Sequence, residues 1–266
     1  MLSYQALKNT VKAIPFVRSL QKDQTKKHFA GDCYGCFWGV FETFEQAMQA
    51  APKTKKMGYN HPELAQEYKT KLNLSISPSD YPMIFWLKEI LQDNWTVFDF
   101  GGNVGDHFYK YEKYITYPTA LKWKICDLPE INKAGETLAK EKNRNELFFT
   151  DAFETANDAD VFLASGSIQY VEHLDISLSS LSKKPRHILI NKLPLSDGSK
   201  FVTLQNGGQV FYPQYVFNKK EFINSISNIG YKLIDIWQDR VHSCKVLSHP
   251  EKSVRYYSGL YLKLRE

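Results

Sequence analysis

The chain has 266 residues, of which 43% are hydrophobic and 14% aromatic, and its formal net charge is +5. This length suits one large domain with an extension and is too short for two full-sized enzyme domains. The hydrophobic share is sufficient to build a core and excludes an intrinsically disordered chain. The small excess of basic residues is not concentrated enough for a nucleic-acid groove, so we expect no nucleic-acid partner.

The sequence predicts a cytoplasmic protein. No apolar run approaches the ~20 residues of a membrane span, and the first residues lack the apolar segment and cleavage site of a signal peptide. The densest basic run lies near the N-terminus. Its favoured interpretation is a solvated helix face, with peripheral contact to an anionic membrane surface as the alternative. The basic residues of this run are Lys8, Lys12, Arg18, Lys22, Lys26 and Lys27.

The four cysteines do not make a disulfide scaffold in a chain of this length. Cys33 and Cys36 are the only close pair, in the sequence Cys-Tyr-Gly-Cys. No second pair and no histidine cluster completes a zinc site. The favoured interpretation is two ordinary, partly buried thiols and no metal, with a metal or redox role as the alternative.

The first 92 residues are predicted to form a mainly helical extension that packs on the main domain. Residues 1–30 have helical spacing of apolar residues, and a short helix is expected to begin near Thr43. Two more helices are predicted, at 61–72 and 83–91, before the pattern changes.

From residue 93 to 266, strands and helices alternate, which predicts an α/β fold. We expect a Rossmann-like, doubly wound sheet of seven strands, mostly parallel with an antiparallel edge strand. Only a loop joins the last two strands, so they are expected to form a hairpin at the edge of the sheet. The seven predicted strands are 95–100, 121–126, 146–150, 160–164, 187–190, 231–237 and 256–264.

The stretch from Trp95 to Tyr109 carries the strongest functional signal. An apolar strand containing Asp99 runs directly into a loop with Gly101, Gly102 and Gly105. Glycine lets the backbone turn with positive φ or approach a ligand closely, and the next helix points N–H groups at that ligand. The spacing is neither the dinucleotide fingerprint nor a Walker loop. A carboxylate here repels phosphate but accepts hydrogen bonds from an ammonium or hydroxyl group, which favours S-adenosylmethionine over NAD. A tight turn with a buried capping Asp is the alternative.

Other acids follow later strands, and ligands of an open parallel sheet bind beyond the carboxyl ends of its strands. Asp127 is predicted to bind the ribose, a role compatible with capping the next helix. Asp151 is predicted to accept from the adenine amino group, with Leu128 or Phe153 covering the ring; an ordinary loop Asp is the alternative. The predicted cofactor-binding residues are Asp99, Gly101, Gly102, Asn103, Gly105, Asp127, Leu128, Asp151, Ala152, Ser165 and Gly166.

Three residues are candidates for a catalytic base. Deprotonating a hydroxyl acceptor calls for a group that titrates near neutrality, which favours histidine. His173 is best placed, on the turn into a helix after the fourth strand, although a structural or capping role is an equal alternative. Lys192 after the fifth strand is the second candidate, and His107 is less available. No serine–histidine–acid order and no metal spacing favours a hydrolase or a metalloenzyme.

Several of these segments resemble the class I S-adenosylmethionine-dependent methyltransferases. From Trp38 to the C-terminus, the sequence is also similar to a family of predicted bacterial methyltransferases, whose members often accompany surface-polysaccharide and lipopolysaccharide genes. The resemblance implies that Asp99 and the glycine loop hold the methionine part, Asp127 the ribose and Asp151 the adenine. In two places the sequence departs from the family pattern: the loop lacks alternating glycines, and Asn-Lys stands where Asp-Arg is usual. The matching segments include Phe98–Gly105, Asp127–Glu130, Phe149–Ala152, Trp38–Ala47, Gly58-Tyr59, Ala164–Tyr170, Leu193–Leu195 and Tyr212-Pro213.

The sequence therefore predicts a bacterial enzyme that methylates a hydroxyl of a small-molecule or sugar-containing acceptor in surface-polysaccharide biosynthesis. S-adenosylmethionine is the predicted cofactor, and His173 or Lys192 is the candidate base. Two alternatives remain: an NAD-dependent enzyme of nucleotide-sugar metabolism, and a non-catalytic binding protein that keeps the fold.

Overall fold

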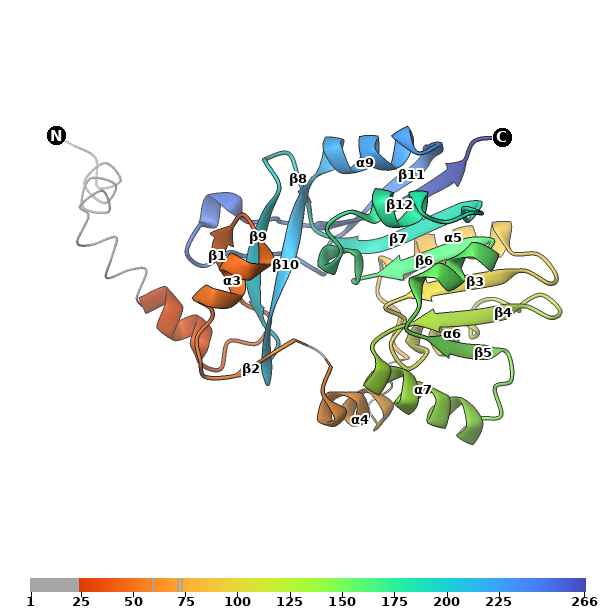
Figure 1. Cartoon of the computed structure of the whole chain (residues 1–266), viewed down its shortest axis with the longest axis horizontal. Coiled ribbons are helices and arrows are strands. Elements are labelled where there is room, and N and C mark those ends of the chain that lie inside the picture. The colour runs from red at the N-terminus through yellow and green to blue at the C-terminus, as the bar shows by residue number, and fades with distance from the viewer. Residues whose placement is uncertain (1–23, 59, 71, 73) are drawn as a thin grey trace. The chain divides into compact units, whose positions relative to one another are not determined.

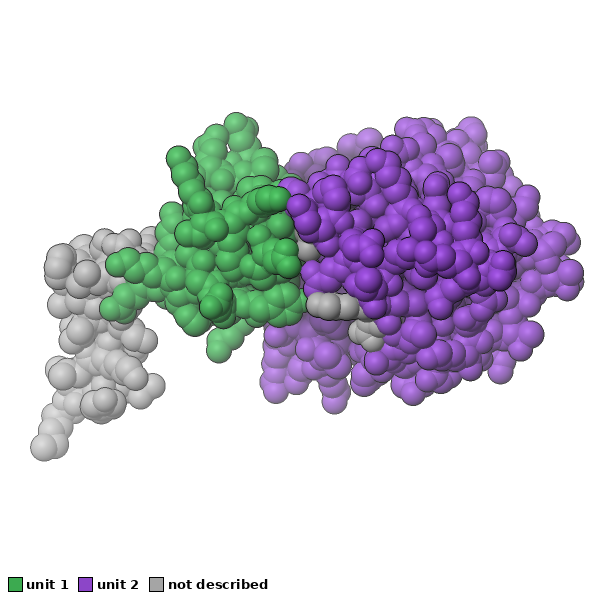
Figure 2. Space-filling view, turned by 90° about the horizontal axis from the view of Figure 1, so that it is seen from below, with its two compact units in different colours: residues 1–58, 201–214, 244–253 green, residues 59–200, 215–243, 254–266 purple. Residues whose placement is uncertain are grey.

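The computed structural model describes residues 24–266 apart from 59, 71 and 73. Most of the helix predicted over residues 1–30, and most of the basic run, lie outside the described residues. The chain divides into two compact units, which Figure 2 colours separately. Unit 1 comprises Met1–Gly58, Phe201–Gln214 and Cys244–Ser253, and unit 2 comprises Tyr59–Lys200, Tyr215–Ser243 and Val254–Glu266.

This division differs from the predicted boundary at residue 92. A sheet of four successive strands, in the order β1-β9-β10-β2, draws segments from both halves of the sequence into unit 1. Strand β1 pairs antiparallel with β9, and Phe37 lies opposite Gln205. Because half of the strand partners come from beyond residue 200, the unit cannot be an N-terminal segment alone. Its strands are β1 (Phe37–Phe41), β2 (Lys56–Met57), β9 (Phe201–Asn206) and the first part of β10 (Val210–Asn218).

The N-terminal third is less helical than predicted. The aromatic segment Phe37–Phe41 is a strand, because its buried residues pair with β9 instead of lining a helix face. The short helix was predicted correctly: α3 (Phe44–Ala50) begins after Thr43, whose hydroxyl accepts from the Gln46 N–H at 3.2 Å. A disulfide joins Cys33 to Cys36, so the prediction of two ordinary thiols is wrong.

Unit 2 contains a seven-stranded sheet in the order β11-β12-β7-β6-β3-β4-β5, visible in Figure 1. Strands β4, β3, β6 and β7 are parallel neighbours, and β5 is parallel to β4. All seven predicted strands are present, so the predicted doubly wound, mostly parallel sheet is confirmed. Their bounds are β3 (Thr96–Phe100), β4 (Lys122–Cys126), β5 (Leu147–Thr150), β6 (Val161–Ser165), β7 (His187–Leu193), β11 (Tyr231–Asp239) and β12 (Tyr257–Leu264).

The helices of unit 2 follow the predicted alternation, although several are shorter or begin earlier than expected. None of the helices in the described part of the chain combines the length and apolar character needed to cross a membrane. The bounds are α4 (Pro62–Thr70), α5 (Asp80–Ile90), α6 (Asp106–Tyr111), α7 (Pro129–Glu141), α8 (Leu174–Ser179) and α9 (Lys219–Asn228), with short 3-10 turns η1 (Phe153–Asp158), η2 (Ile168–Tyr170) and η3 (Pro250–Lys252), the last in unit 1. A two-residue strand β8 (Leu195–Ser196) pairs with the end of β10.

The predicted terminal hairpin is present, but the antiparallel strand is not at the edge. Strand β12 pairs antiparallel with β11 on one side and with β7 on the other, so β11 is the edge strand. Burial explains this order: most of β12 is buried on both faces, whereas β11 alternates between exposed and covered residues. A strand that is apolar on both faces is stable only inside the sheet.

The centre of the sheet is also its switch point. Strand β3 lies between β4, the next strand along the chain, and β6, the third strand after it. Four of the five β3 residues are buried. In open α/β sheets, ligands bind beyond the carboxyl ends of the strands where the strand order reverses. The end of β3 is therefore the expected ligand position in unit 2.

Candidate functional site

The glycine loop joins β3 to α6 at the switch point. Three of its residues have left-handed backbone conformations: Gly101 (φ 69°), Asn103 (φ 56°) and Gly105 (φ 103°). A Cβ on Gly101 would lie 2.4 Å from the Cβ of Ser167, and a Cβ on Gly102 would lie 2.6 Å from Cγ of Asp99. The glycines are therefore needed both for the turn and for close packing beneath the loop.

Asp99 lies under this loop and is fully buried. Its carboxylate accepts from the indole N–H of Trp123 at 3.0 Å, and its two oxygens lie 3.0 and 3.1 Å from Nδ1 of His107. The carboxylate is closed off from solvent in this conformation and lies against the loop from beneath. Its predicted contact with the methionine part of a cofactor stays a prediction. Nδ1 of His107 contacts the same carboxylate.

Asp127 follows strand β4 and is hydrogen-bonded to the glycine loop. Its Oδ2 accepts from the backbone N–H of Asn103 at 2.9 Å, and its Oδ1 accepts from the N–H of Leu128 at 2.7 Å. Burial raises the pKa of Asp127 to about 6, although the two backbone hydrogen bonds act in the opposite direction. Each oxygen uses one acceptor site on the backbone, so a second remains for a ligand hydroxyl.

The ends of β4 and β5 are held together by Asn132, which the sequence reasoning missed. Its side-chain N–H₂ donates to the carbonyls of Asp127 and Thr150, each at 2.8 Å. Asn132 is buried on α7, one turn after the helix begins at Pro129. The only sequence signal was a polar residue on the apolar face of that helix. This contact fixes the spacing between Asp127 and the next predicted residue, Asp151.

Asp151 and its neighbours form an open surface. The Asp151 side chain is exposed and makes no hydrogen bond to the part of the chain that the structure describes, while the N–H of Ala152 is capped by Thr150 Oγ1 at 3.1 Å. Leu128 is 38% exposed. Phe153, the other residue predicted to cover a ring, instead packs against Phe98, Phe100 and Phe162. Leu128 is therefore the apolar side chain available to a ligand.

The loop after β6 contributes small residues and unpaired oxygens. Gly166 has φ 75°, and its N–H donates to the Asn191 carbonyl at 2.9 Å. The hydroxyl of Ser165 and Oε1 of Gln169 are buried without a partner among the described residues, as is Oδ1 of Asp106. Unpaired buried oxygens are costly, and donors of a bound ligand would satisfy them. An ammonium or hydroxyl group of a ligand has the donors that these oxygens lack.

Lys192 lies beside this loop, whereas the His173 side chain is exposed to solvent. A Cβ on Gly166 would lie 3.9 Å from the Cβ of Lys192, whose Nζ is 3.7 Å from the buried carboxylate of Asp80. Burial lowers the pKa of Lys192, and the charge of Asp80 opposes this shift. The His173 side chain is 55% exposed, and its Nε2 is 3.7 Å from Glu172. Of the two predicted bases, Lys192 is the one that lies close to Gly166 and is partly buried.

Asp80 is the second residue that the sequence reasoning missed. It begins α5, is fully buried and accepts from the side chain of Asn191 at 3.3 Å, while Lys110 Nζ lies 3.7 Å away. One carboxylate thus lies between two lysines, Lys110 and Lys192. The turn-rich sequence before α5 indicated a helix start, but no local pattern indicated that this acid reaches the end of β7.

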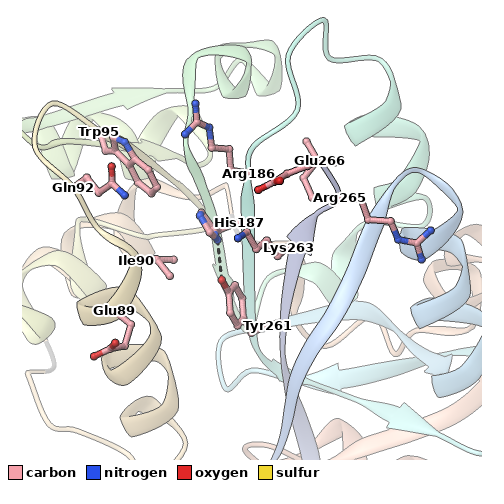
Figure 3. A pocket seen from close by; sticks show the side chains of 11 residues that line it. Glu89, Ile90, Gln92, Trp95, Arg186, His187, Tyr261, Lys263, Arg265 and Glu266 are labelled. Atoms are coloured by element: carbon pink, nitrogen blue, oxygen red, sulfur yellow. Dashed lines mark hydrogen bonds between the residues drawn. The ribbon is translucent and has the colours of Figure 1, made fainter.

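A separate cavity of about 530 Å³ lies near the amino-terminal ends of β3 and β7 and the carboxyl end of β12. Figure 3 shows His187 from the start of β7 facing Tyr261 of β12, and the two are hydrogen-bonded at 2.8 Å. Basic and acidic side chains share its lining, including Arg186, Lys263 and Glu266. The cavity includes none of the predicted cofactor-binding residues.

Comparison with known proteins supports the fold. No protein-family model and no curated protein matches the chain. The magnesium protoporphyrin IX methyltransferase of Synechocystis, solved with bound SAH, is similar at a TM-score of 0.53 and 12% identity, covering 78% of this chain and 96% of that one. The cyclase SpnF is similar at a TM-score of 0.50 and 10% identity, covering 79% and 98%. At these identities the likeness concerns fold alone. The chain therefore has the Rossmann-like fold that these two proteins share.

Proposed function

We propose that the protein is an S-adenosylmethionine-dependent methyltransferase. One observation carries the proposal: at the switch point of the sheet, the Asp127 carboxylate is hydrogen-bonded at 2.9 Å to the backbone of the glycine loop. This hydrogen bond joins the acid that we propose for the ribose to the loop that we propose for the methionine part. A dinucleotide enzyme would need this loop to receive a pyrophosphate, but Asp99 and Asp106 place two acids at its ends.

The proposed cofactor contacts use the oxygen atoms that still have a free acceptor site in the structure. Asp127 would accept from ribose hydroxyls and Asp151 from the adenine amino group, with Leu128 against the ring. The buried oxygens of Asp106 and Ser165 would accept from the ammonium group. Asp99, held by His107 and Trp123, would act by keeping Gly102 and the loop in place. The backbone N–H groups of Ala152, Asn103 and Gly166 already donate within the chain, so these three residues would line the site without donating to the cofactor.

When bound, S-adenosylmethionine would supply a methyl group on a sulfonium centre, whose neutral thioether is a good leaving group. The chain then has to orient the acceptor, exclude water and receive a proton. Lys192 is our candidate for the proton acceptor, because burial favours its neutral amine and it lies beside Gly166. We propose a hydroxyl of a small-molecule or sugar-containing acceptor, and the resemblance to polysaccharide-associated methyltransferases makes sugar nucleotides the first compounds to test.

Titration calorimetry tests the cofactor claim. S-adenosylmethionine and S-adenosylhomocysteine should bind one per chain, and NADH should not. The Asp127→Ala variant should bind at least about tenfold more weakly, whereas Asp158→Ala, which changes an exposed acid in η1, should bind normally. Tight NADH binding, or full S-adenosylmethionine binding by Asp127→Ala, would refute the assignment.

Methyl transfer requires its own test. The protein is incubated with S-adenosylmethionine and a panel of sugar nucleotides, and products are detected by mass spectrometry as an added methyl group. Cofactor binding without turnover on any acceptor would favour a binding protein with this fold. Turnover that survives in Lys192→Met at the wild-type rate would exclude the proposed base.

A further inference from the structure

Unit 1 contains a cluster of soft ligands that methyl transfer does not use. His28, Cys33 and Cys36 each offer one ligand atom, and these atoms lie within 4.8 Å of one another. Nε2 of His28 is 3.2 Å from Sγ of Cys33, and a disulfide joins the two cysteines. The spacing of the cysteines does not indicate the histidine, because His28 precedes the pair by a turn and belongs to the helical residues 24–30.

The backbone holds the two cysteines side by side in a tight turn. The N–H of Cys36 donates to the carbonyl of Cys33 at 3.1 Å, and Gly35 at the third position has φ 74°. This is the arrangement in which glycine is favoured. A Cβ on Gly35 would meet nothing within 4 Å, so the conformation and not a lack of space calls for glycine. The turn therefore keeps both sulfurs together in the reduced and oxidised forms.

One buried side chain from β9 fixes the flanks of the cluster. Asn206 donates from its side chain to the carbonyls of Phe29 at 2.7 Å and Gly31 at 3.0 Å, and its backbone N–H donates to Cys36 at 2.9 Å. Lys55 Nζ donates to Gly31 and to Oδ1 of Asn206. The residues that follow His28 and those around the cysteine pair are thus tied to a single anchor. Such preorganisation lowers the cost of assembling a ligand set.

Two thiolates and an imidazole are the ligands that zinc prefers. With Zn–S of about 2.3 Å and Zn–N of about 2.0 Å, tetrahedral geometry places sulfur about 3.5 Å from nitrogen. The observed distance of 3.2 Å between Cys33 and His28 is close to that value. We propose that the reduced cysteine pair and His28 bind one zinc-class divalent ion, with water as the fourth ligand, and that the disulfide is the metal-free oxidised form.

A thiol–disulfide exchange role fits the cluster less well. Reactive cysteine pairs commonly stand at a helix N-terminus, which lowers the thiol pKa. Here the pair is followed by strand β1, and Cys33 is only 7% exposed. A histidine at ligand distance is unnecessary for exchange but completes a metal site.

The two forms interconvert with balanced chemistry. Reduction breaks the S–S bond, takes up two electrons and two protons from a dithiol reductant, and leaves two thiols while the reductant becomes a disulfide. Zinc binding then releases the two thiol protons. Oxidation by a disulfide reverses the sequence and expels the ion. The site would therefore report the thiol–disulfide balance around the protein.

Cobalt substitution of the full chain tests the proposal. The protein is reduced with dithiothreitol, desalted without oxygen and titrated with Co²⁺. One equivalent should bind, with a near-ultraviolet thiolate-to-cobalt band and the visible spectrum of a tetrahedral ion, and Zn²⁺ should displace it. The oxidised protein should show neither signal. A reduced wild-type chain that binds no cobalt would overturn the proposal.

Variants distinguish this site from adventitious binding. Cys36→Ser and His28→Ala should each weaken cobalt binding by at least about tenfold, and Cys36→Ser should lose part of the thiolate band. Cys126→Ser, which removes a free buried thiol of unit 2, is the matched control and should bind as wild type does. An unchanged spectrum in His28→Ala would overturn the ligand set even if Cys36→Ser fails to fold. Because the cluster lies in unit 1, these outcomes are independent of the proposed methyl transfer.

Discussion

Cofactor affinity should depend on the ionisation of Asp127. Its carboxylate has a pKa of about 6 in the folded protein, raised from 3.8 mainly by burial. A ribose hydroxyl donates to the ionised form, so protonation removes an acceptor from the proposed site. Since only the ionised protein binds well, affinity should be constant above the pKa and fall below it.

The size of the effect follows from the pKa. With a value of about 6, the carboxylate is about 90% ionised at pH 7 and about 10% ionised at pH 5. The Kd for S-adenosylhomocysteine should therefore rise about tenfold between these two pH values. The α-amino group of the ligand stays protonated throughout this range, because its own pKa is near 8. Calorimetry at constant ionic strength measures the change.

Two variants separate this explanation from a general effect of acid. Asp127→Asn keeps the shape but loses the charge, so binding should be about 10- to 100-fold weaker at pH 7 and nearly independent of pH. Asp106→Asn removes a neighbouring charge that raises the Asp127 pKa, so the midpoint should move to lower pH. A wild-type Kd that is flat from pH 7 to 5, or an Asp127→Asn variant with the wild-type slope, would refute the reasoning.

Three other predictions concern the loop, the base and the far end of the sheet. Gly102→Ala places a Cβ 2.6 Å from Cγ of Asp99, so the cofactor affinity measured by calorimetry should fall at least about tenfold. Gly198→Ala is the control, because its Cβ would lie 3.9 Å from the nearest atom, Oγ of Ser196, and this variant should bind the cofactor normally. Lys192→Met should lower kcat by about 100-fold or more while leaving the cofactor Kd within about twofold; a matching loss of both would indicate a structural role. Burial lowers the pKa of His187 to about 4 in the folded protein. As the pH falls, this histidine is therefore protonated in the unfolded chain at a higher pH than in the folded chain. The free energy of unfolding should fall by at most about 3 kcal/mol between pH 6.5 and pH 4. Urea unfolding should show this loss in the wild type and a flatter profile in His187→Gln; equal slopes would exclude His187 as the cause.

Local sequence patterns were sufficient to place the seven strands of the sheet and the polar residues that follow them. Each strand of unit 2 is a short apolar run, and the glycines, Asp127 and Asp151 come directly after such runs. Parallel strands bring their carboxyl ends to one edge, so residues at those ends meet whatever the exact strand lengths. The same reasoning placed Lys192 at that edge. The roles of these residues in ligand binding stay predictions.

Contacts between distant parts of the chain determined the rest. The Asp99 carboxylate is buried because Trp123 and His107, which come later in the chain, contact it. The partner of Lys192 is Asp80, which also meets Asn191, 111 positions further along the chain. Unit 1 exists only because β9 and β10 return to β1, and the cluster at His28 depends on Asn206, 177 positions from Phe29. Periodicity and spacing report which face of an element is buried, but the partners on that face are set by how elements pack. The sequence alone therefore determined that a glycine loop and its acids share one edge, and only the tertiary structure decided which of them are free to meet a ligand.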